Sequence, residues 1–226
     1  MTDGAPNSVL EPLDWSNIDT VFLDMDGTLL DLNYDNHVWN EVVPSAYADA
    51  RQMPLDKAKS ELLEHMQDIY GTIDFYSFEY WHEFTGLNLR TLHADHDHLV
   101  AYRPGALEFL RWLTQRNKVS IIATNAHPDS VAVKDAKLDL SVEVTSIVSS
   151  QYFRAPKEDI AYWQGMQSVH PFDPERSLFI DDHQRVLQTA QEYGIGHLYT
   201  IHTPDSARPA RQDLSFPAFD HFDDLT

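Results

Sequence analysis

Two carboxylates stand at the end of an apolar run near the start of the chain. Residues 21–28 read Val-Phe-Leu-Asp-Met-Asp-Gly-Thr, so an apolar strand would run directly into Asp24 and Asp26. Residues i and i+2 of a strand share a face, and both side chains would therefore point into one crevice. Two unpaired carboxylates at that distance repel each other, and Mg²⁺, which prefers oxygen ligands, would relieve the repulsion. The alternative interpretation is a polar Asp-Gly turn without chemistry.

A second apolar run also ends in polar residues. Thr124 and Asn125 follow residues 119–123 and offer a hydroxyl and an amide. Open α/β sheets bind ligands at the carboxyl ends of their strands, so these groups would join Asp24 at one edge of a sheet. Thr124 by itself could equally be a helix cap.

A third apolar run, residues 177–180, ends in Asp181 and Asp182, and Lys157 lies between the second and third runs. Adjacent acids after a buried strand are electrostatically costly unless a cation is present. Lys157 could balance the charge of a phosphoryl group, although most lysines are solvated surface charges. Taken together, the three strand ends and the lysine predict one phosphotransfer site.

The order and spacing of these residues resemble the haloacid dehalogenase (HAD) superfamily over about residues 18–200. The four motifs of that superfamily are matched by Asp24-Met-Asp-Gly-Thr28, Thr124, Lys157 and Asp181-Asp182. The resemblance implies a Rossmann-like α/β core, a doubly wound parallel sheet, with an inserted helical cap. It also implies Mg²⁺ as the cofactor. Dehalogenases of the superfamily lack the second aspartate of the first motif, so Asp26 indicates the phosphatase and phosphomutase branch.

The same resemblance implies a role for each residue. Asp24 would be the nucleophile that forms an aspartyl-phosphate. Asp26 would protonate the leaving oxygen and later activate water, while its backbone carbonyl is left for the metal. Thr124 and Lys157 would bind the phosphoryl group. The expected metal ligands are Asp24, Asp26, Asp181 and Asp182. Whether Asp181 binds the metal directly or through water stays open.

Several segments are similar to the bacterial GMP/IMP nucleotidases of this superfamily. Asn125-Ala-His-Pro128, which Ala132-Val-Lys134 follows, and Pro204-Asp-Ser206 discriminate best. This resemblance implies hydrolysis of purine nucleoside 5′-monophosphates, with IMP and GMP preferred. The expected substrate-binding residues are Thr124, Asn125, His127 and Lys157. His127 or an amide of the cap could read the 6-oxo edge of the base.

Two other functions stay open. A sugar-phosphate phosphatase or phosphomutase would use the same core residues. A non-catalytic protein on this fold would be expected to have lost one of the residues that carry the chemistry. Asp24, Asp26, Lys157 and Asp182 are all present, which argues against the non-catalytic alternative but does not separate the two enzymes.

The segment between the first and second motifs is expected to be helical. Leu62, Met66 and Ile69 follow helical spacing, an earlier helix is expected to stop near Pro44, and a later one to end at Gly86. In HAD proteins an insertion here is a helical cap over the site. We therefore expect a cap at residues 34–99 and a core made of residues 1–33 and 100–226.

The remainder of the core alternates strands and helices, which predicts a parallel sheet. The expected strands are residues 119–123, 146–149, 177–180 and 195–199. The expected helices are residues 131–137, 158–167 and 184–193, followed by an irregular tail up to residue 219.

Composition limits the possible partners. The net charge is −20, from 36 acidic and 16 basic residues, and it argues against nucleic acid or an anionic membrane surface as a partner. The expected partner is a small phosphate monoester, and protein partners cannot be inferred. The chain has no cysteine, which excludes disulfides and fits a cytoplasmic enzyme.

Some histidines and aromatic residues invite a different interpretation. His93, His96 and His98 alternate with other residues and could bind Zn²⁺, but a solvated edge of the cap is favoured. His127 could contact the substrate or cap the next helix. The cap aromatics could stack a base or fill the cap core, and the core is favoured for them. These aromatics are Trp39, Phe75, Tyr76 and Trp81.

Overall fold

A computed structural model describes residues 12–226, and residues 1–11 of the expected core lie outside the described part. Parallel strands form one sheet in the order β3-β2-β1-β4-β5-β6. The strands are β1 (Thr20–Leu23), β2 (Val119–Thr124), β3 (Ser146–Ser149), β4 (Ser177–Ile180), β5 (His197–Ile201) and β6 (Ala218–Phe219). The predicted α/β class with a parallel sheet is therefore confirmed.

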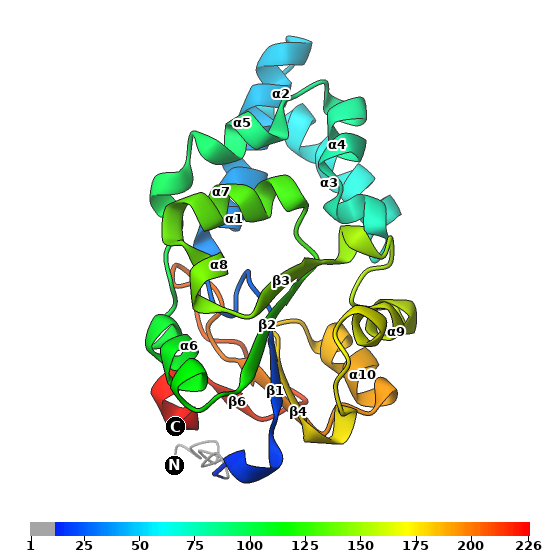
Figure 1. Cartoon of the computed structure of the whole chain (residues 1–226). Coiled ribbons are helices and arrows are strands. Elements are labelled where there is room, and N and C mark those ends of the chain that lie inside the picture. Colours follow the sequence, from blue (N-terminus) through cyan, green and yellow to red (C-terminus); the bar gives the residue numbers. More distant parts are fainter. Residues whose placement is uncertain (1–11) are drawn as a thin grey trace, which may run out of the picture.

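Helices cover both faces of the sheet, as Figure 1 shows for α6 on one side and α9 and α10 on the other. The core helices are α6 (Ala106–Gln115), α7 (Pro128–Leu138), α8 (Leu140–Glu143), α9 (Ile160–Val169) and α10 (Gln184–Tyr193). Successive residues of β1 face opposite layers. Phe22 packs with Trp163 of α9, whereas Val21 and Leu23 belong to the hydrophobic cluster that contains Phe109 of α6. The predicted doubly wound arrangement is thus confirmed.

The segment inserted after β1 is helical and lies over the carboxyl ends of the strands (Figure 1). It contains α1 (Asn33–His37), a π-helical turn (Val38–Val42), α2 (Val43–Arg51), α3 (Leu55–Ile69), α4 (Phe78–Thr85) and α5 (Leu89–Ala94). Its buried side chains join the hydrophobic cluster on the α6 face of the sheet. The division into a cap at residues 34–99 and a core stays a proposal.

One expected helix end in this segment is wrong. The first helical run does not stop near Pro44 but continues from Asn33 to Arg51. Proline lacks an N–H and its ring crowds the preceding turn of an α-helix. Here a wider π-helical turn directly precedes α2, with the Val43 N–H bonded to the Val38 carbonyl, and it accommodates Pro44 within the continuous run.

Other expected bounds also differ from the structure. Helix α7 runs over Pro128–Leu138 rather than residues 131–137, because His127 caps it and Pro128 begins it. Helix α9 begins at Ile160 rather than residue 158, because the Asp159 side chain caps it by accepting from the Ala161 N–H. Strand β5 begins two residues later than expected, at His197. The short strand β6 lies in the tail that was expected to be irregular, where its backbone pairs with β5.

The two connections between the sheet and the inserted segment pair with each other. Leu30 and Tyr102 form an antiparallel bridge, and the Asp31 N–H donates to the Ala101 carbonyl at 3.0 Å. The motif Pro204-Asp-Ser206 supports this connection, since the Pro204 carbonyl accepts from the Leu32 N–H at 2.9 Å. The late motif therefore holds the start of the inserted segment in place.

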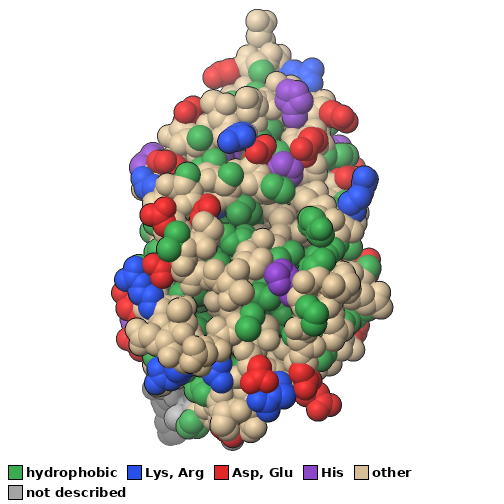
Figure 2. Space-filling view, viewed as in Figure 1, with side chains coloured by type: hydrophobic (Ala, Val, Ile, Leu, Met, Phe, Trp, Pro, Cys, Tyr) green, Lys and Arg blue, Asp and Glu red, His purple; other side chains and the backbone are tan. Residues whose placement is uncertain are grey.

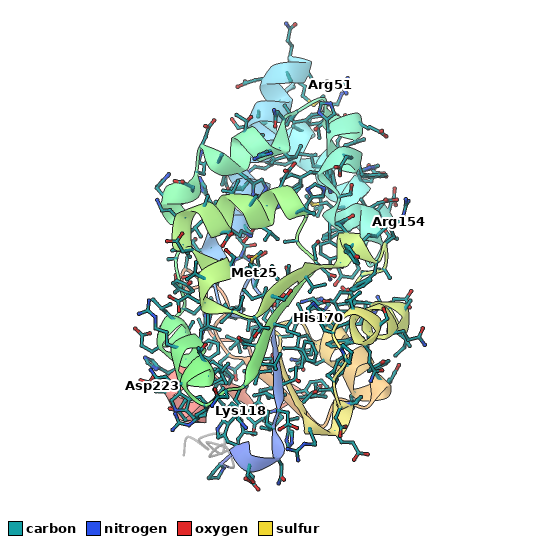
Figure 3. All side chains as sticks on the ribbon, viewed as in Figure 1. Met25, Arg51, Lys118, Arg154, His170 and Asp223 are labelled. Atoms are coloured by element: carbon teal, nitrogen blue, oxygen red, sulfur yellow. The ribbon has the colours of Figure 1, made fainter. Side chains whose placement is uncertain are left out.

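The interior and the surface follow the sequence pattern. Figure 3 shows Met25 in the interior and Arg51 at the far tip of the inserted segment, and Met25 is fully buried. Acidic side chains are spread over the face in Figure 2, above both the helical segment and the sheet. Within residues 12–226, none of the helices combines the length and apolar character that a membrane span needs.

Candidate active site

The carboxyl ends of β1, β2 and β4 bring the predicted residues together. Leu23 pairs with Ile122 and with Ile180, so the residues that follow these strands emerge at one edge of the sheet. Asp24, Thr124 and Asp181 are all buried there. Neighbouring parallel strands in register therefore convert three distant segments into one cluster.

Lys157 lies at the centre of this cluster. Its ammonium donates to Asp24 Oδ1, to Asp181 Oδ2 at 2.7 Å and to the Ala123 carbonyl at 3.0 Å. Burial opposes the charged form, but Asp181 and Asp24 hold the pKa of Lys157 well above its ordinary value. The lysine is thus a buried cation and not a solvated surface charge.

Three carboxylates form a group that could hold a metal ion. One oxygen each from Asp24, Asp181 and Asp182 lies within 4.8 Å of the others. Burial, together with repulsion between carboxylates, raises the pKa of Asp24 and of Asp182 to about 7 and that of Asp181 to about 6. An all-oxygen set of this kind suits Mg²⁺, which would stabilise the ionised carboxylates.

The backbone after β1 is shaped to bring Asp182 close. Gly27 has a φ of +88°, a conformation that L side chains rarely adopt, and a Cβ atom there would lie 2.9 Å from Asp182 Cγ and 3.1 Å from Pro204 Cβ. Its N–H donates to the Leu30 carbonyl at 2.8 Å and closes the turn. Only glycine lets this turn pack against Asp182 without strain.

The Asp26 carboxylate is held outside the three-carboxylate group. Its Oδ1 accepts from Lys134 Nζ at 2.6 Å, and the same ammonium donates to both oxygens of Asp35 at 2.8 and 3.0 Å. Lys134 is fully buried. Burial and the neighbouring Asp26 raise the pKa of Asp35 to about 7, against the opposing effect of Lys134. Asp24 and Asp26 thus pair with two different lysines.

Thr124 and Asn125 line the cavity above Lys157. The Thr124 hydroxyl accepts from the Ala126 N–H at 3.0 Å and can still donate one hydrogen bond. The Asn125 side chain accepts from the Lys157 N–H at 2.9 Å and donates to Glu158 at 2.9 Å. Glu158 in turn accepts from the Tyr76 hydroxyl at 3.0 Å, so Asn125 also connects the site to the inserted segment.

His127 caps α7, as one of its two predicted roles required. Its Nδ1 accepts from the Asp129 N–H at 3.2 Å, and its Nε2 lies 2.7 Å from a Glu79 oxygen. The ring stacks on Phe78 with the ring centres 4.9 Å apart. Both ring nitrogens have partners within the chain, and contact with a substrate stays a prediction.

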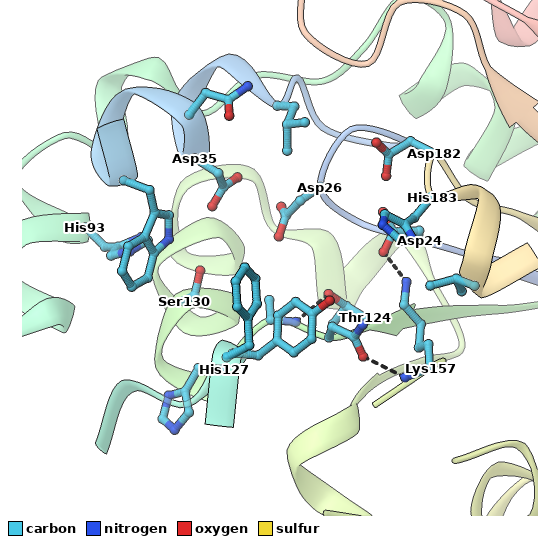
Figure 4. A pocket seen from close by; sticks show the side chains of 18 of the residues that line it. Asp24, Asp26, Asp35, His93, Thr124, His127, Ser130, Lys157, Asp182 and His183 are labelled. Atoms are coloured by element: carbon cyan, nitrogen blue, oxygen red, sulfur yellow. Dashed lines mark hydrogen bonds and ion pairs between the residues drawn. The ribbon is translucent and has the colours of Figure 1, made fainter. Parts of the chain in front are cut away.

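A cavity of about 360 Å³ joins these residues to the inserted segment, and Figure 4 shows much of its lining. This volume lies within the range of small-molecule sites. Asp24, Thr124 and Lys157 line one part of it. The aromatic lining consists of Trp39, Phe75, Tyr76, Phe78 and Trp81. The four aromatics named from the sequence therefore all line the cavity, and Trp39 and Trp81 also pack in the hydrophobic cluster.

The solvated position expected for His93 is wrong. This residue is 1% exposed, and the rings of Tyr34, Trp39 and Phe78 surround it. Burial lowers the pKa of His93 to about 3, so the ring stays neutral. The Tyr34 hydroxyl lies 3.1 Å from its Nδ1.

Lys134, Asp35 and Glu158 belong to this site but have no role predicted from the sequence. Lys134 lies in a segment that resembles the nucleotidases, but a lysine in a helix normally indicates a solvated face. Its one signal is the spacing from Ser130, since both residues lie on the buried face of α7. Glu158 directly follows Lys157, and nothing in the sequence distinguishes it from a surface acid.

The chain belongs to the haloacid dehalogenase-like hydrolase family, whose model matches residues 18–194. Two curated relatives, both described as "GMP/IMP nucleotidase YrfG", come from Escherichia coli (strain K12) and Shigella flexneri. Each is 32% identical over 208 residues, which cover 92% of this chain and 94% of the relative.

Solved structures share the fold. A HAD phosphatase from Thermococcus onnurineus has a TM-score of 0.76 at 14% identity and covers 90% of this chain and 94% of its own. A predicted phosphoglycolate phosphatase from Haemophilus somnus 129Pt has a TM-score of 0.64 at 14% identity, covering 90% and 95%. At these identities the likeness concerns the fold alone.

Proposed function

We propose that this chain is a Mg²⁺-dependent phosphomonoesterase that hydrolyses GMP and IMP through an aspartyl-phosphate. One observation carries the proposal: the buried Asp24, Asp181 and Lys157 and the partly buried Asp182 line a cavity that also has an aromatic lining. The similarity to GMP/IMP nucleotidases over 92% of the chain supports the substrate class.

In the first step, an Asp24 oxygen attacks the phosphorus and the ester P–O bond breaks. Asp26 gives its proton to the departing ribose oxygen, and the nucleoside leaves. Water then attacks the aspartyl-phosphate, Asp26 takes its proton, and the bond between phosphorus and Asp24 breaks to release phosphate. Positioning and charge stabilisation supply most of the catalysis in such reactions.

Charge balance determines the remaining roles. Lys157 and the Thr124 hydroxyl would bind the phosphoryl oxygens, while Asn125 holds the Lys157 backbone at 2.9 Å. Mg²⁺ bound by Asp24, Asp181, Asp182 and the Asp26 carbonyl would neutralise phosphoryl charge. The acidic exterior does not prevent anion binding, because charges beyond a Debye length of about 8 Å are largely screened.

The aromatic lining suits the base of a nucleotide. Stacking a base on an aromatic side chain contributes roughly 1–3 kcal/mol. Asn36, Asn40 and Ser130 also line the cavity and could pair with hydroxyls of a sugar or with the base, so the comparison of substrates below decides between the two classes. Separation of GMP from AMP requires a polar group that reads the 6-oxo edge, since an unpaired donor in the site penalises the wrong base.

The test is kcat/KM for IMP, GMP, AMP, UMP and glucose 6-phosphate, each with Mg²⁺ and read by phosphate release. We expect IMP and GMP to be cleaved most efficiently. Trp39→Leu should weaken nucleotide cleavage more than that of a small alkyl phosphate, and Trp112→Leu, at a tryptophan packed on Trp15 of the core, serves as the control. If AMP or glucose 6-phosphate matches IMP, the function is that of a general HAD phosphatase. Isomerised sugar phosphate without phosphate release would indicate a phosphomutase.

A further inference from the structure

We infer that Lys134 and Asp35 are positioning residues that orient the Asp26 carboxylate for proton transfer, a role that rests on the proposed phosphatase function. The three N–H groups of Lys134 are matched by three oxygens, one from Asp26 at 2.6 Å and two from Asp35 at 2.8 and 3.0 Å. The Tyr34 ring lies 5.3 Å from the same ammonium. Every donor of the lysine is therefore used inside the protein.

Lys134 acts through Asp26 and not on the substrate. Asp26 and Asp35 are among the described residues that line the cavity, whereas Lys134 is not and has no exposed surface. Figure 4 shows the Asp26 and Asp35 carboxylates turned toward each other beside the cavity. A phosphate ester in the cavity would meet the two carboxylates and not the ammonium.

The lysine holds one oxygen of Asp26 and leaves the other for the reaction. Within residues 12–226, the hydrogen bond recorded for the Asp26 carboxylate is the one on Oδ1, and the side chain keeps 18% of its surface exposed. Anchoring Oδ1 fixes the side-chain torsions and so places Oδ2. Misplacing a catalytic group by about 1 Å can cost on the order of 10²-fold in rate, so this anchor affects catalysis.

Asp35 holds the lysine in place. It binds Lys134 through both oxygens, and it belongs to α1, the first helix of the inserted segment. Lys134 belongs to α7 of the sheet layer, and Asp26 to the turn after β1. Three separate elements therefore have to be packed together before the Asp26 carboxylate is oriented.

The stability of the fold alone does not explain why Lys134, Asp26 and Asp35 are charged residues. Apolar residues of similar volume often replace a buried ion pair with no loss of stability, whereas removal of one partner is costly. A structural role would make Lys134 a tie between α7 and its neighbours. A positioning role predicts in addition that loss of Lys134 slows cleavage most for esters whose leaving oxygen needs a proton.

The experiment compares two esters in the full-length enzyme with Mg²⁺, p-nitrophenyl phosphate and an alkyl phosphate. The nitrophenolate leaves without a proton, and the alkoxide needs one. Because kcat/KM covers the steps up to departure of the leaving group, it isolates the acid role from the later water attack. The variants are Lys134→Met, Lys134→Arg and Asp35→Asn. Lys137→Met, on the same helix but 37% exposed, is the matched control.

For Lys134→Met we expect kcat/KM to fall on the order of 10²-fold for the alkyl ester and less than about 5-fold for the nitrophenyl ester. Asp35→Asn should also reduce kcat/KM more for the alkyl ester than for the nitrophenyl ester, but by a smaller factor. Lys134→Arg should recover part of the activity toward the alkyl ester. Lys137→Met should change neither ester.

Equal losses for both esters in folded Lys134→Met would overturn the inference, as would full activity. If that variant does not fold, Asp35→Asn decides by the same comparison, with the melting temperature as the check on folding. The test does not depend on the substrate preference, so its result can still be interpreted if the GMP/IMP proposal fails. A wild-type chain that releases phosphate from neither ester and from none of the nucleotides would instead refute the phosphatase function, and the inference with it.

Discussion

Two buried lysines, each shared by two carboxylates, divide the candidate site. Lys157 binds Asp24 and Asp181, which belong to the sheet edge and to the group that could hold a metal. Lys134 binds Asp26 and Asp35, and Asp35 comes from the helical segment above the sheet. Asp24 and Asp26 are only two residues apart, yet they are held by different cations.

The separate lysines show how one turn could serve the two roles that we propose for Asp24 and Asp26. Asp24 lies against Asp181 and Lys157, where a nucleophile and the phosphoryl charge can be stabilised together. The Asp26 carboxylate instead accepts from Lys134, which also binds Asp35 of the inserted segment, and we propose that the leaving group of a bound ester lies on this side.

The largest effect is expected at the nucleophile. Asp24→Asn keeps the shape of the side chain but removes the attacking carboxylate, so turnover should fall by on the order of 10⁴-fold or more. Phosphate release from GMP measures it, with circular dichroism as the check on folding. Asp19→Asn, an exposed acid just before β1 that pairs with Arg176, is the control and should keep full activity. Turnover of Asp24→Asn at a tenth of the wild-type rate would mean that Asp24 is not the nucleophile.

A smaller and selective effect is expected at Asp26. Asp26→Asn keeps the backbone carbonyl, so Mg²⁺ binding should largely survive, while turnover of GMP falls on the order of 10²-fold or more. The pre-steady-state burst of p-nitrophenolate should fall less, because this leaving group needs no proton. Equal losses in the two bursts would count against the acid role.

The turn between the two aspartates gives a third test. Gly27→Ala would strain a backbone with a φ of +88° and press on Asp182, whose Cγ lies 2.9 Å from the added carbon. We expect Mg²⁺ affinity to fall roughly 10- to 100-fold, as when the support of a metal ligand is lost. The Mg²⁺ dependence of activity measures this, and Gly86→Ala, at a helix end where a Cβ meets no atom within 4 Å, is the control for strain. An unchanged Mg²⁺ dependence would show that Mg²⁺ binding does not require Asp182 in its present position.

The smallest effect concerns pH and Mg²⁺. The pKa of Asp24 and of Asp182 is raised by burial from the ordinary 3.8 to about 7, so the folded chain keeps protons there that the unfolded chain releases. The stability of the metal-free chain should therefore fall as the pH rises from about 4 to 7. Mg²⁺ binds the ionised form and should raise the melting temperature by about 2–4 °C at pH 8 and by less at pH 5.

Thermal unfolding with and without Mg²⁺ at the two pH values checks this prediction. Asp182→Asn serves as the control, since it removes one carboxylate of the group and keeps the acidic exterior that could bind Mg²⁺ weakly. The same temperature shift at pH 5 and pH 8, or in the variant, would refute the assignment of the Mg²⁺ effect to these carboxylates.

The residues at the sheet edge were predictable because the signal for each strand end lies in a short stretch of sequence. Apart from the exposed Val119, each apolar run is buried, and each ends in residues such as Asp24 and Asp181 that do not suit a strand interior. Parallel pairing then places all the strand ends at one edge, so the sequence order alone predicted which residues meet. The helix end at Gly86 was predictable for a similar reason, because glycine readily adopts the left-handed backbone that ends a helix. Gly86 has this backbone, with a φ of +77°.

The second lysine could not be predicted because its partners are distant. Lys134 contacts residues 108 and 99 positions away, and only the packing of α1 against α7 and the first turn reveals that it is buried. His93 was misjudged for the same reason, as its covering rings come from other helices. Strand β6 has two residues, one pairing partner and a preceding proline, which is too little pattern to detect.

Trapping of the covalent intermediate tests the division between Asp24 and Asp26 most directly. The protein is mixed with ³²P-labelled GMP and Mg²⁺, quenched in acid, and digested to locate the label. We expect label on the peptide that contains Asp24 in the wild-type chain and no label in Asp24→Asn. Label that persists in Asp24→Asn, or that lies on another peptide, would contradict it.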